Sequence, residues 1–117
     1  MVGAFLAASR DGDFARLVAV LAPGVVLRAD ELSVRTAAAR PGAPALAPEV
    51  RGAAAVADAF KGRARGAQQV LIDGAPGAVW AAGGQVRAAF LFEIEDGVIT
   101  GIDLVMEPEL IAELDVQ

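Results

Sequence analysis

The chain has 117 residues and a net charge of −5, and 56% of its residues are hydrophobic by a count that includes alanine. Such a length is typical of a single domain, which we take to span residues 1–117, and the acidic balance argues against direct binding to nucleic acid. The sequence has no cysteine, histidine or tyrosine, so we expect no disulfide, no metal site and no cofactor, and any acid–base chemistry must use Asp, Glu, Lys or Arg.

The first thirty residues predict two helices and a strand. Residues 2–9 indicate a short helix, which an Asp-Gly-Asp sequence ends. Asp13 is a good N-cap for a second helix, because its carboxylate can accept hydrogen bonds from the free amides of the first turn. We expect Pro23-Gly24 to end that helix, and residues 25–30 to form the first strand.

The middle of the chain predicts a loop, a helix and two strands. Residues 31–48 contain several prolines and show no clear periodicity, which indicates a long loop. Residues 51–65 predict a helix with Phe60 on its buried face. Strands are expected over residues 68–73 and 78–82, separated by a turn rich in glycine and proline.

The longest regular pattern is a hairpin over residues 86–106. Apolar and more polar side chains alternate along its first strand, as in a strand with one buried face. Asp96-Gly97 is a typical turn sequence between two such strands. A two-residue turn would pair Glu95 with Val98, and would place Asp103 on the same face as the phenylalanines.

A three-residue turn is the alternative, with Gly97 left-handed and a bulge beside it. It would pair Ile94 with Val98. Asp103 would then lie outside, near Arg87, as a surface ion pair. We prefer this register, because it places the apolar sets of both strands on one face and a one-residue slip would move every side chain to the other face. The cross-strand pairs that it predicts are Phe90 with Ile102 and Phe92 with Thr100.

The chain ends in a short apolar helix. Pro108 prevents the last strand from continuing, and the next residues place Leu110, Ile111 and Leu114 on one side of a helix. A helix of this length is not stable alone, so it must pack on this domain or on a partner. The order of elements, helices first and consecutive strands later, favours an α+β fold in which one curved, mostly antiparallel sheet wraps three helices.

Four segments resemble the SnoaL-like C-terminal domain of SigJ-type extracytoplasmic-function sigma factors: residues 4–30, 50–60, 70–80 and 92–114. At the level of fold, the whole chain is similar to the cone-shaped fold of nuclear transport factor 2, ketosteroid isomerase and SnoaL-like polyketide cyclases. The motifs that carry the closer resemblance are Asp73-Gly74-Ala75-Pro76-Gly77, Asp96-Gly97-Val98-Ile99 with Ile102-Asp103, and Glu107-Pro108-Glu109-Leu110.

The sequence departs from that family at two motifs. The family's DGGGK motif should fall near Asp30, where this chain has Asp30-Glu31-Leu32-Ser33-Val34. In the tail, Glu107 stands where the family usually has Asn or Asp, and the basic residue after the proline is missing. Both motifs are implicated in regulation of the sigma factor in the family. Because this chain departs from both, the resemblance does not carry that mode of regulation over to it.

Two carboxylates are the catalytic candidates if the chain is an enzyme. Asp30 ends the first strand, near the mouth of the cone, where the resemblance to ketosteroid isomerase implies a general base. A carboxylate in an apolar pocket can have a raised pKa, although a polar end of a strand is the simpler interpretation of Asp30. Asp103 is the second candidate, but only in the register that places it among the phenylalanines.

Apolar residues of the helix and the strands could line a ligand cavity, although aromatic residues at such spacing often form only a core. The expected pocket residues are Phe60, Trp80, Phe90, Phe92, Ile102 and Leu104. The resemblance implies a second surface in the tail, which would contact sigma-factor core regions or RNA polymerase. The residues of that expected partner surface are Pro108, Leu110, Ile111 and Leu114.

The preferred hypothesis is a non-catalytic regulatory domain that binds a partner or a small apolar ligand. The alternative is a small isomerase, polyketide cyclase or hydrolase that acts on an apolar ring compound with Asp30 as its acid or base. A homodimer formed through the outer face of the sheet is a third class. No apolar run is long enough to span a bilayer and the N-terminus lacks the basic start of a signal peptide, so we expect a cytoplasmic protein.

Overall fold

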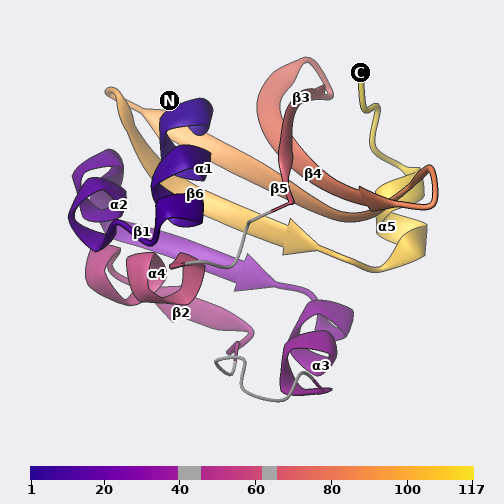
Figure 1. Cartoon of the computed structure of the whole chain (residues 1–117), viewed down its shortest axis with the longest axis horizontal. Coiled ribbons are helices and arrows are strands. Elements are labelled where there is room, and N and C mark those ends of the chain that lie inside the picture. The colour runs from indigo at the N-terminus through magenta and orange to yellow at the C-terminus, as the bar shows by residue number, and fades with distance from the viewer. Residues whose placement is uncertain (40–45, 62–65) are drawn as a thin grey trace.

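A computed structural model of the chain describes residues 1–39, 46–61 and 66–117 (Figure 1). The described residues form a curved six-stranded sheet in the order β2-β1-β6-β5-β4-β3, in which β1 and β6 are parallel and all other neighbours are antiparallel. The helices are α1 (Val2–Asp11), α2 (Phe14–Val20), α3 (Glu31–Ala39), α4 (Ala53–Phe60) and α5 (Pro108–Ala112). The strands are β1 (Leu21–Ala29), β2 (Glu49–Arg51), β3 (Gln68–Ile72), β4 (Ala75–Ala82), β5 (Gln85–Glu95) and β6 (Val98–Val105).

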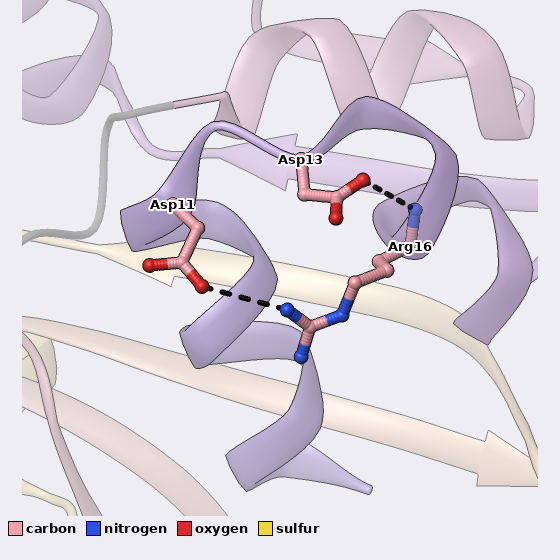
Figure 2. Close-up of polar contacts among 3 residues, drawn as sticks. All are labelled: Asp11, Asp13 and Arg16. Atoms are coloured by element: carbon pink, nitrogen blue, oxygen red, sulfur yellow. Dashed lines mark hydrogen bonds and ion pairs between the residues drawn. The ribbon is translucent and has the colours of Figure 1, made fainter.

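The α1–α2 corner forms as the sequence predicts. Gly12 ends α1 in the left-handed conformation (φ 65°), which glycine adopts without steric cost. Asp13 caps α2, because its Oδ1 accepts a hydrogen bond of 3.2 Å from the backbone N–H of Arg16. Figure 2 shows that the Arg16 side chain turns back to the Asp11 carboxylate, 3.4 Å away. This exposed ion pair joins the end of α1 to the start of α2.

The first strand begins earlier than expected. Pro23-Gly24 does not end α2, because the helix stops at Val20 and both residues lie inside β1. The register of β1 against β6 shifts between Leu21 and Val26. Proline has no N–H to donate to a ladder, so it fits at such an irregular point in a strand.

The loop expected over residues 31–48 is wrong for its first half. Residues 31–39 form α3, because Asp30 caps the helix and the following residues include several good helix formers. The prolines that suggested a loop lie further along, and residues 40–45 of that expected loop are outside the described residues. The helix expected over 51–65 is α4, and residues 62–65 are also outside the described part.

The helix count is five in the described residues, not three. Three of them, α1, α2 and α4, cover one face of the sheet as expected, whereas α3 and α5 lie at its end (Figure 1). The core between these helices and the sheet has Phe5, Leu17 and Phe60 at its centre, each fully buried. None of the described helices is long and apolar enough to cross a membrane.

The β5–β6 hairpin uses the turn that we did not prefer. Asp96 and Gly97 both have positive φ (51° and 78°), and Glu95 pairs with Val98, so the turn has two residues. The register then shifts further along, where Thr100 is an extra residue on β6 and its hydroxyl donates to the Glu93 carbonyl.

Because of this bulge, the apolar side chains of both strands lie on the same face of the sheet beyond Thr100. Phe92 opposes Ile102 and Phe90 opposes Leu104, so the expected partners of both phenylalanines are wrong by two residues. Asp103 still lies on the other face from the phenylalanines, but its neighbour across the ladder is Arg28 of β1, not Arg87. The expected face of Asp103 is therefore correct, although the reason given for it is not.

The C-terminal segment packs on the outer face of the same sheet. Val116 forms an isolated antiparallel bridge with Ile72, and the backbone of residues 115–117 bonds to that of residues 71–73 over 2.8–2.9 Å. Leu114 and Val116 pack against a small buried cluster of Ile72, Val79 and Ala89. The tail thus covers part of the edge of β3 and part of the sheet's outer face.

Candidate functional site

Asp30 lies at a junction of β1, α3 and the end of β6. Its Oδ1 accepts hydrogen bonds from the backbone N–H of Ser33 (2.9 Å) and from the Ser33 hydroxyl. Its Oδ2 accepts from the backbone N–H groups of Met106 (2.8 Å) and Glu107 (2.9 Å). Both carboxylate oxygens are therefore used, and they tie the start of one helix to the end of a strand far along the chain.

These hydrogen bonds determine the charge state of Asp30. Partial burial pushes its pKa upward, but the bonds from Ser33, Glu107 and Met106 outweigh that effect, so the pKa lies below its ordinary value. A carboxylate that is held in its ionised form is a weak general base. The arrangement thus gives Asp30 the task of capping α3 and fixing the end of β6.

Glu107 and Ser33 complete this junction, and sequence reasoning assigned neither of them a role. The Glu107 Oε1 accepts a hydrogen bond of 3.2 Å from the backbone N–H of Leu32, in return for the N–H that Glu107 gives to Asp30. Ser33 is 2% exposed. Asp30 followed by an acidic first turn and Ser33 is an N-terminal helix signal, which could have revealed this end of the junction.

The two motifs at which the chain departs from the SigJ-type pattern meet at this junction. Residues 30–34 stand where that pattern has its glycine-rich motif, and Glu107-Pro108 stands where it has its tail motif. The hydrogen bonds of Asp30 and Glu107 join them directly. A change at either motif would therefore alter the same contact.

The three phenylalanines of the expected pocket meet in the core with Phe5, which sequence reasoning left out of the set. The Phe5 ring lies edge-to-face against Phe60 (centroids 5.0 Å apart) and against Phe92 (5.4 Å). Phe60 in turn contacts Phe90 at 6.1 Å. Helices α1 and α4 thus supply rings to the same cluster as β5, as edge-to-face packing favours.

The other expected pocket residues divide into two groups. Ile102 and Leu104 are 1% and 6% exposed and belong to the same core as the rings. Trp80 is 36% exposed, and its indole lies over Gly66, where an added Cβ would come within 2.8 Å of the Trp80 ring. Trp80 is therefore placed to sense changes at the rim of the core.

Asp103 lies on the outer face of the sheet. Burial raises its pKa, the guanidinium of Arg28 lowers it, and the carboxylate of Glu93 raises it, so the pKa stays above its ordinary value. Asp103 borders a groove of about 480 Å³ between the sheet and the tail, with Leu91, Val105 and Leu114 on its apolar side. The charged residues that line this groove are Arg28, Asp30, Asp73, Asp103 and Glu113.

Helix α5 separates the residues of the expected partner surface into two groups. Leu110 and Leu114 line the acidic outer groove, whereas Pro108 and Ile111 line a second groove of about 480 Å³ beside α3. Leu110 is 45% exposed. The four residues therefore do not form one continuous stripe on the described surface.

Charged groups are kept out of the described core. Ser9 and Ser33 are the fully buried polar residues in the described ranges, and the buried residues there include no Asp, Glu, Lys or Arg. The described acidic residues also form no group of three that could hold a metal ion. The described core between the helices and the sheet thus contains apolar side chains, and its buried polar residues are two serines of the helices.

Sequence comparisons and structure comparisons gave different results. No family model matches the sequence, and no curated protein matches it. Among solved structures, the extracytoplasmic function sigma factor SigJ of Mycobacterium tuberculosis is similar over 95% of this chain, with a TM-score of 0.68 and 21% identity. The chain spans 43% of the SigJ chain.

Smaller proteins are similar over nearly their whole length. An NTF2-like protein of unknown function from Cytophaga hutchinsonii covers 96% of this chain and is covered over 91% of its own length, with a TM-score of 0.55 and 14% identity. A predicted polyketide cyclase from Xanthomonas campestris covers 96% of this chain and is covered over 92% of its own length, with a TM-score of 0.52 and 19% identity. The chain therefore has the nuclear transport factor 2-like fold that SnoaL-like proteins share.

Proposed function

We propose that the chain is a non-catalytic regulatory domain that binds a partner or a small apolar ligand, related to the C-terminal domain of SigJ-type sigma factors. The fold likeness to SigJ, which extends over 95% of this chain, is consistent with such a role. A regulatory domain of this kind acts in the cytoplasm, and leaves contact with DNA to its partner. Its own net charge of −5 fits that division.

One observation carries the proposal: the carboxylate expected to act as a base is fully occupied by structural hydrogen bonds. Four donors surround the Asp30 oxygens, and the pKa of Asp30 is lowered, not raised toward neutral pH. The other candidate, Asp103, lies on the opposite face of the sheet from the aromatic cluster. Neither carboxylate belongs to the core cluster that contains the aromatic rings.

The ligand that suits the described core is small and apolar. Phe60, Phe90 and Phe92 bring aromatic rings to the centre of the fold, and Trp80 lies at its rim. A ligand that enters beside these residues should alter Trp80 fluorescence and raise the melting temperature. A screen of steroid-like and polyketide-like compounds that produced neither response would count against a ligand-binding role.

The partner that we propose is a sigma-factor core region or RNA polymerase, with α5 as the contact. Biolayer interferometry of the purified domain against both would test this. Leu110→Asp should weaken binding without lowering the melting temperature, because Leu110 is 45% exposed. Phe14→Asp is a matched control on α2, where the side chain is 40% exposed and distant in sequence from α5. Equal binding by the wild type and Leu110→Asp would remove α5 from the contact.

The fold likeness to a predicted polyketide cyclase is the observation behind the alternative, in which the chain is an enzyme. An isomerase, cyclase or hydrolase with Asp30 as its acid or base would lose turnover by about 10²–10⁴-fold in Asp30→Asn. Ser33→Ala is a useful companion, because it removes one hydrogen bond to Asp30 and keeps the carboxylate. Turnover that survives in folded Asp30→Asn would exclude Asp30 as the catalytic group.

The homodimer hypothesis concerns the outer face of the sheet. In the described chain the tail packs on part of that face, so a dimer would have to use the remaining surface or displace the tail. Light scattering coupled to size-exclusion chromatography at several concentrations would determine the oligomeric state directly.

A further inference from the structure

The groove between α3 and α5 differs in chemistry from the acidic groove on the other side of α5. Its apolar lining comes from α3, β5 and α5 and from the connection that precedes α5: Leu32, Val86, Met106, Pro108, Ile111 and Ala112. Its polar lining residues are Gln85 and Arg87, and no carboxylate lines it. Its volume of about 480 Å³ lies within the range of small-molecule pockets, roughly 300–1,000 Å³.

Arg87 is the distinctive residue of this groove. It is exposed, and none of the ion pairs among the described residues includes it. Four carboxylates directly flank lining residues in sequence: Glu31, Glu107, Glu109 and Glu113. Glu31 forms an ion pair with Arg35, the Glu107 Oε1 already accepts a hydrogen bond from Leu32, and Glu113 lines the groove on the other side of α5. Arg87 thus presents, beside an apolar surface, a guanidinium that no described residue pairs with, and it offers a place for an anion.

We propose that this groove binds a small organic monocarboxylate with an aliphatic body, of the size of decanoate. The aliphatic lining would cover the hydrocarbon chain, and the planar guanidinium of Arg87 matches a carboxylate in bidentate geometry. Arg87 is the one cation among the described residues that line the groove, which suits a monoanion. This site is separate from the aromatic cluster, and it does not depend on the function proposed above.

An NMR titration of the isotope-labelled full chain with decanoate would test the site. We expect shifts in the backbone amide signals of Val86, Arg87 and Ile111, and saturable binding. Arg87→Gln keeps a polar side chain but shortens it and removes its charge, and it should raise the Kd for decanoate about tenfold, the equivalent of one charge-assisted hydrogen bond. Decanol, which lacks the charge, should bind the wild type and Arg87→Gln equally.

Arg28→Gln is the matched control, because Arg28 lines the groove on the other side of α5. It should leave the Kd for decanoate unchanged. The proposal fails if decanoate moves no groove amide, or if Arg28→Gln weakens binding as much as Arg87→Gln. Tighter binding of an apolar peptide with a free C-terminal carboxylate would assign the groove to a protein terminus instead. A dimer that Arg87→Gln dissociates would assign it to a second copy of the chain.

Discussion

Asp30 joins residues that lie more than seventy positions apart in the chain, and this predicts a large effect of Asp30→Asn on stability. An amide has one acceptor oxygen, so it cannot accept from both Ser33 and the Met106–Glu107 amides. We expect the free energy of unfolding to fall by about 1.5–3 kcal/mol, the usual value of hydrogen bonds to a charged group. Urea denaturation would measure it, with Asp58→Asn, an exposed site on α4, as the control.

The same residue predicts the sign of one pH effect. Because the pKa of Asp30 is lowered in the folded state, its contribution to stability is present above the pKa of an unfolded aspartate and is lost as the pH falls through its folded pKa. The difference in stability between the wild type and Asp30→Asn should therefore shrink in acid. A difference that stays constant down to strongly acidic pH would show that the ionised carboxylate is not what holds the junction.

Asp103 predicts the opposite pH effect. Its pKa is raised because burial and Glu93 disfavour the charge more than Arg28 favours it. The folded state therefore binds a proton more readily than the unfolded state, and stability falls as the pH rises from the unfolded to the folded pKa. Asp103→Asn should raise the melting temperature at pH 7 and have little effect below the ordinary aspartate pKa of about 3.9. A lower melting temperature at pH 7 would contradict this.

At the scale of elements, the hairpin turn between β5 and β6 depends on one glycine conformation. Gly97 has a φ of 78° and open space around its Cα, so a methyl group there would meet no atom and would only strain the backbone. Gly97→Ala should cost about 1–2 kcal/mol, the usual penalty for a left-handed residue. Gly24→Ala also meets no atom and has no such φ, so it should be close to neutral. Equal stabilities in thermal melts would refute the two-residue turn.

The hairpin also shows what a sequence can predict about such an element. The alternation of side chains correctly located both strands and the Asp96-Gly97 turn. It could not locate the bulge at Thr100, because alternation indicates only which residues share a face of the sheet. A bulge beside the turn and a bulge a few residues further along leave the same side chains on each face. For this reason the apolar sets were matched correctly, while the predicted cross-strand partners of the two phenylalanines were wrong by two residues.

Helix α3 shows a different limit. Prolines and missing periodicity over residues 31–48 outweighed the local capping signal at Asp30, although that signal was present. The contact that makes Asp30 important is with residues 106–107, more than seventy residues away. No local pattern reports such a contact, so sequence reasoning could name Asp30 but could not separate a structural carboxylate from a catalytic one.

At the scale of the whole molecule, the parallel pairing of β1 with β6 organises the fold. These strands are far apart in sequence and adjacent in the sheet, and their pairing brings Asp30 beside the end of β6. The order of helices and antiparallel strands predicted the α+β class of the fold and predicted that helices cover one face of the sheet. The position of β1 in the sheet was not predicted, because a parallel neighbour needs a long connection that leaves no local signal.

The closing of the tail on the outer face gives the last prediction. Truncation after Pro108 would remove Leu114 and Val116 from the cluster of Ile72, Val79 and Ala89, and would free the edge of β3. We expect the free energy of unfolding to fall by about 2–4 kcal/mol, the value of burying two or three aliphatic side chains less the cost of ordering them.

Truncation should also promote self-association, because it exposes an apolar patch next to an unpaired strand edge. Urea denaturation and sedimentation velocity on the full chain and the truncated chain would measure both effects. Val116→Asp is a companion variant that disturbs the same cluster and keeps α5. If the truncated chain has the same free energy of unfolding as the full chain and associates no more than it does, the contacts of residues 109–117 do not stabilise the domain. The tail would then remain available for a partner alone.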